Sequence, residues 1–219
     1  MKDEIKVAVY GAGEMGRQAL HYLRLMNYEP PSPIMVGWFD DTKKIGEEIE
    51  GFSVLGGYRD VLNQYNQGIF NSLFIAIGYN HLEFKLRLVK QFKPHIPLFN
   101  IIAKETYVDS TASIGNNIMI YPGAIVDKEA IIEDGVVINL GCIVSHNSRI
   151  GACSFLAPRV TAAGFSDIGS CSFLGVSSTV IDNLSVCSHI RLGAGAVITD
   201  DIKEPGLYIG IPAHLYGKS

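Results

Sequence analysis

The 219-residue sequence predicts an α/β unit of Rossmann type over residues 1–100, followed by a parallel β-helix over residues 101–219. Three observations predict this combination. Strand-like and helix-like segments alternate in the first hundred residues. From Val108 onward an aliphatic residue recurs at every sixth position, and one seven-residue segment returns almost unchanged after 18 residues. We place the boundary between Pro97 and Lys104, where the six-residue period begins.

Three strands are expected in the first domain, over Ile5–Tyr10, Ile34–Phe39 and Ser72–Ile77. The first strand runs through a glycine-rich loop into a helix from about Arg17 to Met26. The third runs through Gly78 into a helix that carries Leu82, Leu86 and Val89 on one face. Strands that alternate with helices favour a small parallel sheet.

The aliphatic period occupies 16 positions from Val108 to Ile198, and every one except Ala162 is Val, Ile or Leu. Four positions after each of them stands a small residue in 12 of the 16 cases. A period of six fits neither an α-helix nor a simple strand. It predicts short strands joined by corners, with the aliphatic side chain inside and three hexapeptides in each 18-residue coil.

The repeated segment is Ile150–Leu156, which matches Ile168–Leu174 one coil later, so Cys153 and Cys171 are expected to stack. The four cysteines include no C-x-x-C pair, and we interpret them as small buried thiols without a metal or redox role.

The formal net charge of −4 argues against a nucleic-acid partner, because such binding requires a basic surface. The first residues, from Met1 on, show no signal-peptide pattern, and no apolar run approaches the roughly 20 residues that span a bilayer. A cytoplasmic location is therefore expected.

The loop Gly11-x-Gly13-x-x-Gly16 stands between a strand and a helix, where backbone N–H groups can bind a phosphate. Asp40 follows Gly16 by 24 residues, near the offset of a carboxylate that holds a ribose in dinucleotide enzymes. Three interpretations stay open: a nucleotide-sugar site, a dinucleotide site, or a structural turn. The α/β unit has half the usual length of a dinucleotide fold, which favours the first.

Among the six histidines, His146 stands out because it occupies an outward-facing position of a regular coil. An imidazole suits proton transfer near neutral pH. The β-helix histidines offer no close pair for a three-histidine zinc site of the γ-carbonic anhydrase type, and no metal is expected.

Several motifs together resemble a known family: the glycine loop, Phe39-Asp40-Asp41, Ala76–Asn80, the stretch from Asn139 to Gly151, Leu192–Ala196 and Tyr208–Ala213. Over essentially its whole length the chain resembles the bacterial nucleotide-sugar N-acetyltransferases and their sialic acid O-acetyltransferase relatives. These are hexapeptide-repeat enzymes with a left-handed β-helix. The resemblance implies a homotrimer that moves an acetyl group from acetyl-CoA to the amine of a nucleotide-linked 4-amino-4-deoxy sugar, in surface polysaccharide biosynthesis.

The resemblance also implies site residues. His146 would be the general base, with Asn147 beside it and the Gly164 N–H as oxyanion donor. The acetyl-CoA site would include Phe155, Gly164, Val176 and Ala194. The nucleotide sugar would be held by Gly11, Gly13, Glu14, Met15, Asp40, Asp41, Gly78 and Asn139.

Two positions depart from the family pattern. Asn147 replaces an acid that commonly follows the histidine, and Phe155 stands where a matching relative has a second histidine. An amide can orient an imidazole but brings no charge to it. A sugar O-acetyltransferase and a non-catalytic nucleotide-sugar-binding protein therefore stay as alternatives.

Overall fold

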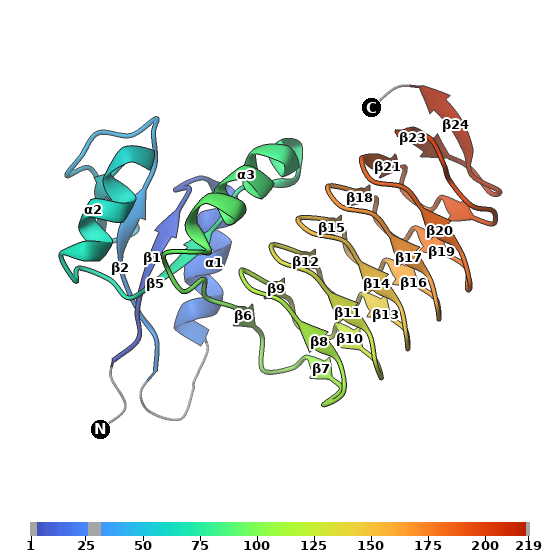
Figure 1. The fold of residues 1–219 in the computed structure, drawn as a ribbon, viewed down its shortest axis with the longest axis horizontal. Helices are drawn as coiled ribbons and strands as arrows, with labels where there is room; N and C mark the ends of the chain where they lie inside the picture. The colour runs from blue at the N-terminus through green and yellow to red at the C-terminus, as the bar shows by residue number, and fades with distance from the viewer. Residues whose placement is uncertain (1–3, 26–31, 218–219) are drawn as a thin grey trace. The chain divides into compact units, whose positions relative to one another are not determined.

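The computed structural model describes residues 4–25 and 32–217, so Met1 and Met26 lie outside the described residues. The chain divides into two compact units, Met1–Ile101 and Ile102–Ser219. Figure 1 shows an α/β sheet in the first unit and a stack of coils in the second. Both predicted fold classes are confirmed.

The N-terminal sheet has five strands in the order β3-β4-β2-β1-β5. Their bounds are β1 Lys6–Tyr10, β2 Ile34–Phe39, β3 Glu48–Ile49, β4 Phe52–Gly56 and β5 Ser72–Ile75. Pairing is parallel except between β3 and β4, which form a hairpin. The prediction of three strands was therefore wrong in number, because the hairpin strands are too short to show alternation.

The helices of this unit are α1 Glu14–Leu25, α2 Val61–Asn66 and α3 Leu82–Phe92, with single turns of 3₁₀ helix at Tyr58–Asp60 and Tyr79–His81. On α3 the buried apolar residues are Leu82, Leu88, Val89 and Phe92, whereas the predicted core residue Leu86 is half-buried. Trp38, Phe39, Phe70 and Phe74 are fully buried and fill the core of the unit.

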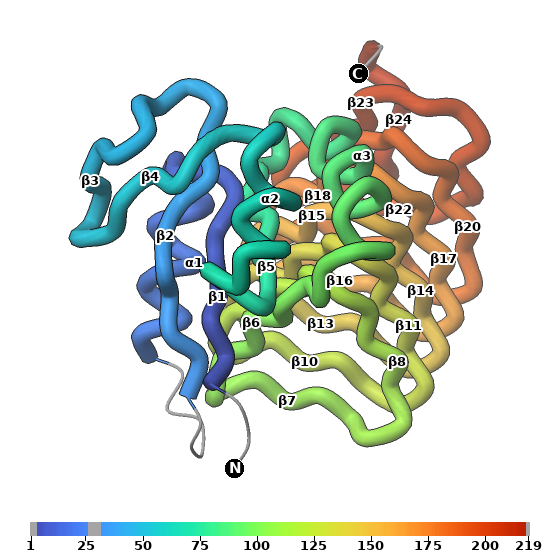
Figure 2. The backbone as a smooth tube through the Cα atoms, turned by 60° about the vertical axis from the view of Figure 1, so that its left-hand side comes forward, coloured from blue at the N-terminus to red at the C-terminus, as the bar shows by residue number. Residues whose placement is uncertain are grey.

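The second unit is a parallel β-helix with three sheets, whose strands follow one another along the stack in Figure 2. One sheet holds β7 Tyr107–Val108, β10 Ile125–Val126, β13 Ile143–Val144, β16 Thr161–Ala162, β19 Thr179–Val180 and β22 Val197–Ile198. The second holds β8 Ser113–Ile114, β11 Ile131–Ile132, β14 Arg149–Ile150, β17 Asp167–Ile168 and β20 Ser185–Val186. The third holds β6 Ile101–Ile102, β9 Met119–Ile120, β12 Val137–Ile138, β15 Phe155–Leu156, β18 Phe173–Leu174, β21 Ile190–Leu192, β23 Gly206–Ile209 and β24 His214–Gly217.

Successive coils pair in an 18-residue register, as in Ile125 with Ile143 and Phe155 with Phe173. The periodic aliphatic residues from Ile120 to Ile198 are at most 2% exposed, and the small residues Ser148, Ser154, Ser166, Ser172 and Ser178 are at most 1% exposed. Val108 and Ile114 are half-buried, since the first coil has a neighbouring coil on one side only. The predicted inward orientation is confirmed.

Of the four thiols, Cys142, Cys153 and Cys171 are buried, but Cys187 is half-exposed, so the prediction of four buried cysteines was wrong for Cys187. Burial raises the pKa of Cys142 to about 11, which keeps that thiol protonated and unreactive. Among the described residues, no helix is long and apolar enough to cross a membrane.

Candidate functional site

The glycine loop connects β1 to α1 at the carboxyl edge of the sheet. Gly11 adopts φ +102°, and its N–H donates to the Phe39 carbonyl at 2.7 Å. A Cβ at this position would stand 2.8 Å from the Ala76 carbonyl oxygen. The positive φ and the close Ala76 carbonyl therefore require glycine at position 11, independently of any ligand.

Gly13 has a different environment. It is exposed, and among the described residues no atom lies within 4 Å of where its Cβ would stand. Gly13 immediately precedes α1, and its carbonyl accepts the Arg17 N–H at 3.0 Å. The first N–H groups of a helix have no acceptor within the helix, so the start of α1 can bind an anion. Packing within the described part of the chain therefore does not require glycine at this position.

Asp40 ties the glycine loop to the end of β2. One carboxylate oxygen accepts the Ala12 N–H at 2.9 Å, and the other accepts the N–H and hydroxyl of Thr42 at 2.8 and 2.6 Å. Partial burial alone would raise the pKa of Asp40, but the bonds from Thr42 and Ala12 outweigh it and hold this pKa below its ordinary value. The ionised Asp40 carboxylate thus stabilises the glycine loop by accepting hydrogen bonds from Ala12 and Thr42.

Asp41 stabilises the neighbouring 3₁₀ turn Tyr58–Asp60. It accepts the Tyr10 hydroxyl in a short hydrogen bond and the Tyr58 N–H at 2.8 Å. Burial and the bond to Asp41 raise the pKa of the Tyr10 phenol, which remains a donor. Sequence reasoning missed Tyr10 because it reads as the last residue of an apolar strand.

A cavity of about 630 Å³ lies within the N-terminal unit beside this turn. Its lining joins apolar side chains to the cations Arg87 and Lys90 on α3, and comprises Asp41, Tyr58, Phe84, Arg87, Leu88, Lys90 and Gln91. Gly78 precedes the turn Tyr79–His81, and no described atom lies within 4 Å of where its Cβ would stand. The predicted residues Gly13, Asp40 and Asp41 thus share one edge of the sheet, at the ends of β1 and β2.

In the β-helix, His146 lies at an exposed corner between β13 and β14. Gly164 occupies the equivalent corner one coil later. A Cβ on Gly164 would stand 2.7 Å from Cε1 and 2.9 Å from Nε2 of His146, so only glycine leaves room for the imidazole in this position. No described residue accepts a hydrogen bond from the Gly164 N–H. The structure therefore brings the predicted base and the predicted oxyanion donor together.

Two further residues contact the imidazole. The ring of Phe165 packs against the imidazole in a T-shaped arrangement, with ring centroids 5.2 Å apart and an interplanar angle of 83°. The Oδ1 atom of Asn147 lies 3.2 Å from Nδ1 of His146. Asn147 in turn donates from Nδ2 to Glu129 at 2.7 Å. Glu129 was not predicted, although counting back 18 residues from Asn147 would have found it.

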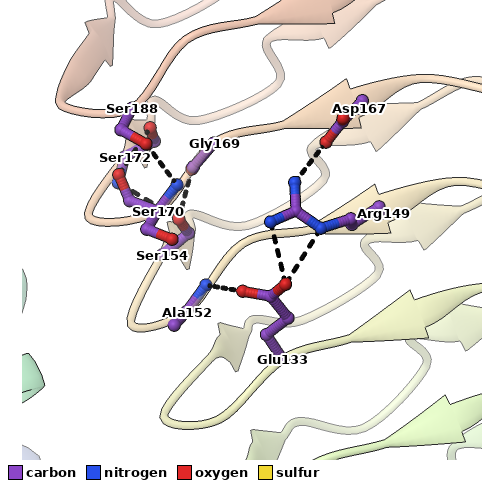
Figure 3. A network of polar contacts seen from close by, with 9 residues as sticks. All are labelled: Glu133, Arg149, Ala152, Ser154, Asp167, Gly169, Ser170, Ser172 and Ser188. Carbon is purple, nitrogen blue, oxygen red and sulfur yellow. Dashed lines mark hydrogen bonds and ion pairs between the residues drawn. The ribbon is translucent and has the colours of Figure 1, made fainter.

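The strand that follows this corner is fixed by an ion-pair network, shown in Figure 3. Arg149 donates from Nε to Glu133 at 2.9 Å and from NH1 to Asp167 at 2.5 Å. Glu133 also accepts the Ala152 N–H at 2.9 Å. In the same figure the Ser154 hydroxyl donates to the Gly169 carbonyl at 3.0 Å. These bonds link successive coils.

The remaining predicted residues lie elsewhere on the β-helix. Val176 and Ala194 are exposed at a different corner, 18 residues apart, where the Gly195 N–H donates to the Val176 carbonyl at 2.8 Å. Asn139 is half-buried and accepts the Leu140 N–H at 2.8 Å. Phe155 is 7% exposed and stacks on Phe173, so it offers a ligand little surface in this chain.

Comparison with sequence families matches residues 6–92 to the PglD N-terminal domain. A curated relative, UDP-3-O-acylglucosamine N-acyltransferase of Janthinobacterium sp., is 32% identical over 103 residues, which cover 47% of this chain and 29% of the relative. The chain thus spans less than a third of the length of this relative.

Solved structures match the whole chain. PerB from Caulobacter crescentus, in complex with CoA and GDP-perosamine, is 27% identical with a TM-score of 0.85, and the match covers 99% of both chains. The acetyltransferase domain of PglB from Neisseria gonorrhoeae is 25% identical with a TM-score of 0.84, and the match covers 96% of this chain and 98% of that domain. Both units of this chain and their order are therefore similar to those of PerB.

Proposed function

Because the chain belongs to the hexapeptide-repeat family of bacterial nucleotide-sugar N-acetyltransferases, we propose that it transfers an acetyl group from acetyl-CoA to the amine of a nucleotide-linked 4-amino-4-deoxy sugar. The observation that carries the proposal is the corner at which His146 is exposed over Gly164. The likeness to PerB, solved with CoA and GDP-perosamine, supports this class of substrate.

In this proposal the N-terminal unit holds the nucleotide. The diphosphate binds at the start of α1, against Gly13 and the N–H groups of Glu14 and Met15. Asp40 and Asp41 fix the loops around it through their internal bonds, and Gly11 and Gly78 shape the backbone beside them. The open space at Gly13 supports this assignment.

The β-helix provides the chemistry. Nε2 of His146 takes a proton from the sugar amine as the nitrogen attacks the thioester carbonyl, and the Gly164 N–H donates to the oxygen that gains charge. The C–S bond then breaks, and the proton on His146 passes to the leaving CoA thiolate, which departs as free thiol. Attack is direct, without an acyl-enzyme. Acetyl-CoA binds along the coils near Val176 and Ala194, which are exposed at one corner of the helix.

We further propose a homotrimer in the cytoplasm that contributes to surface-glycan precursor synthesis. Tyr107, Ile125 and Ile143 form a ladder on successive strands of one sheet and are 55%, 40% and 39% exposed. An exposed apolar ladder favours an interface between copies. Light scattering is expected to give about 72 kDa, three times the 23.9 kDa of one chain. A mass near that of one chain would contradict the trimer.

The experiment that tests the activity is release of free thiol from acetyl-CoA in the presence of nucleotide-linked 4-amino sugars. GDP-, UDP- and dTDP-linked amines form the first panel, and the same sugars with a hydroxyl in place of the amine form the second. Turnover with an amine and none with its hydroxyl counterpart is expected. Turnover confined to hydroxyl acceptors would replace the proposal with O-acetylation, and binding without thiol release would make the chain a non-catalytic sugar-nucleotide-binding protein.

A further inference from the structure

Two columns of residues meet at the His146 corner. Residues at equivalent places in successive coils are Lys128, His146 and Gly164 in one column, and Glu129, Asn147 and Phe165 in the next. Backbone bonds impose the stacking: the Asn147 N–H donates to the Lys128 carbonyl at 2.9 Å, and the Phe165 N–H donates to the His146 carbonyl at 3.1 Å. Glu129 and Asn147 share the left-handed conformation, with φ of 57° and 58°. Their side chains therefore leave the helix side by side.

The polar atoms of these side chains form a chain of three groups. The carboxylate of Glu129 accepts from Nδ2 of Asn147 at 2.7 Å, and Oδ1 of Asn147 lies 3.2 Å from Nδ1 of His146. The bond from Asn147, and then the Lys128 ammonium 3.3 Å away, hold the pKa of Glu129 below its ordinary value. Glu129 is therefore an anion under all conditions in which the enzyme would work.

The order of donors and acceptors along this chain follows from the charge at its end. An ionised carboxylate only accepts hydrogen bonds, so it selects the NH₂ side of the Asn147 amide. The amide oxygen must then face the imidazole. Because that oxygen also only accepts, Nδ1 of His146 has to carry the hydrogen, and Nε2 is left with its lone pair. A general base needs this tautomer at the nitrogen that faces the substrate.

We infer that Glu129 is a positioning residue that acts through Asn147 to hold His146 in the tautomer with Nε2 unprotonated; the inference rests on the proposed role of His146 as base. The acid that Asn147 replaces in the sequence is thus supplied from the preceding coil. Phe165 and Gly164 complete the arrangement, since one fixes the plane of the ring and the other leaves space for it.

The first test is Glu129→Gln, which removes the charge at constant size. A glutamine amide can donate or accept, so Asn147 is free to turn and the tautomer is no longer selected. We expect kcat to fall on the order of tenfold, less than the 10²-fold or more expected for loss of the base, with both Michaelis constants unchanged. Glu129→Asp should recover part of the rate, and Glu105→Gln, at another exposed corner, should have wild-type activity.

A double-mutant cycle separates positioning from general structure. If Glu129 acts through the amide, Glu129→Gln should cost nothing further in an Asn147→Ala background. A tenfold loss that persists in this background would overturn the inference, as would wild-type turnover for the single variant.

A readout independent of turnover is the ¹⁵N spectrum of histidine-labelled protein, in which signals of His146 are assigned by their loss in His146→Ala. At alkaline pH, where the imidazole is neutral, the full-length protein should show an unprotonated Nε2, and Glu129→Gln should show a mixture of tautomers. An identical tautomer in both proteins would refute the role of Glu129. Absence of thiol release with every acceptor would instead refute the proposed function, while the spectra would still report the tautomer.

Discussion

The two units of the chain position polar groups in different ways. In the N-terminal unit, Asp40 and Asp41 stand at the ends of strands and are held by contacts that occur once, with Ala12, Thr42, Tyr10 and Tyr58. In the β-helix, Glu129, Asn147 and His146 are held by a register that recurs in every coil. A loop site depends on many distinct residues, whereas a corner site is specified by position in the repeat and a few side chains. A single substitution should therefore disturb more of the site's polar contacts in the first unit than in the second.

The largest expected effect is that of His146→Ala at the corner. Loss of a positioned general base lowers kcat on the order of 10²-fold or more, while both Michaelis constants stay unchanged because the proposed binding groups are other residues. Steady-state kinetics by thiol release measure both, and His95→Gln, an exposed histidine of the other unit, serves as control. A variant with near-normal turnover would place the base elsewhere.

The glycine loop offers a sharper contrast between folding and binding. Gly11→Ala should destabilise the protein by about 1–3 kcal/mol, because a Cβ meets the Ala76 carbonyl at a positive φ. Gly13→Asn should change stability by no more than about 0.5 kcal/mol, because the space beside it is open and Asn caps helices well.

Binding should show the reverse order. Gly13→Asn places a side chain where the diphosphate is proposed to lie, and its nucleotide-sugar affinity should fall at least about tenfold, or about 1.4 kcal/mol. Acetyl-CoA affinity should be retained. Denaturant titration and calorimetry with each ligand check the two halves, and equal loss of both ligands would contradict the assignment of one ligand to each unit.

The smallest expected effect is the pH dependence of the stability that Asp40 contributes. Its pKa is lowered in the folded chain, so its contribution to stability is complete above the unfolded pKa of about 3.9 and is lost as pH falls through the folded value. The difference in urea midpoint between wild type and Asp40→Asn should be largest near neutral pH and should shrink below about pH 4. A difference that is constant with pH would mean that the Asp40 charge does not stabilise the loop.

The same contrast explains what the sequence could predict. The β-helix follows from its period, because each aliphatic residue has one inward position and every coil repeats it. The hairpin of β3 and β4 and the short helix α2 were missed, since a turn at Glu50 and Gly51 and two strands of a few residues carry no periodic signature. Gly11 and Gly13 look alike in the motif, and only the surrounding backbone shows that one is required by packing and the other is not.

At the corner, the sequence predicted that His146 and Gly164 belong to one site, and the structure places them side by side, but the link from Asn147 to Glu129 was not predicted. This link depends on side-chain rotamers and on which end of the Asn147 amide faces the Glu129 carboxylate. Neither can be inferred from the order of residues in the sequence. The 18-residue register does limit the candidate partners of a corner residue, since each such residue stacks only on the residues 18 positions before and after it.

The stacking of coils also determines how the β-helix opens. Because each coil pairs only with the coils before and after it, unfolding is expected to start at the ends and to proceed inward one coil at a time. The coil that holds His146 pairs through β10 and β16 with coils on both sides, and further coils follow beyond each of them. The hydrogen-bonded amide protons of Ile143 and Arg149, in the strands on either side of this corner, should accordingly exchange with solvent far more slowly than those of the terminal strands. The proposed base, His146, is exposed on the surface but lies in a coil that fraying from the ends of the β-helix is expected to reach last.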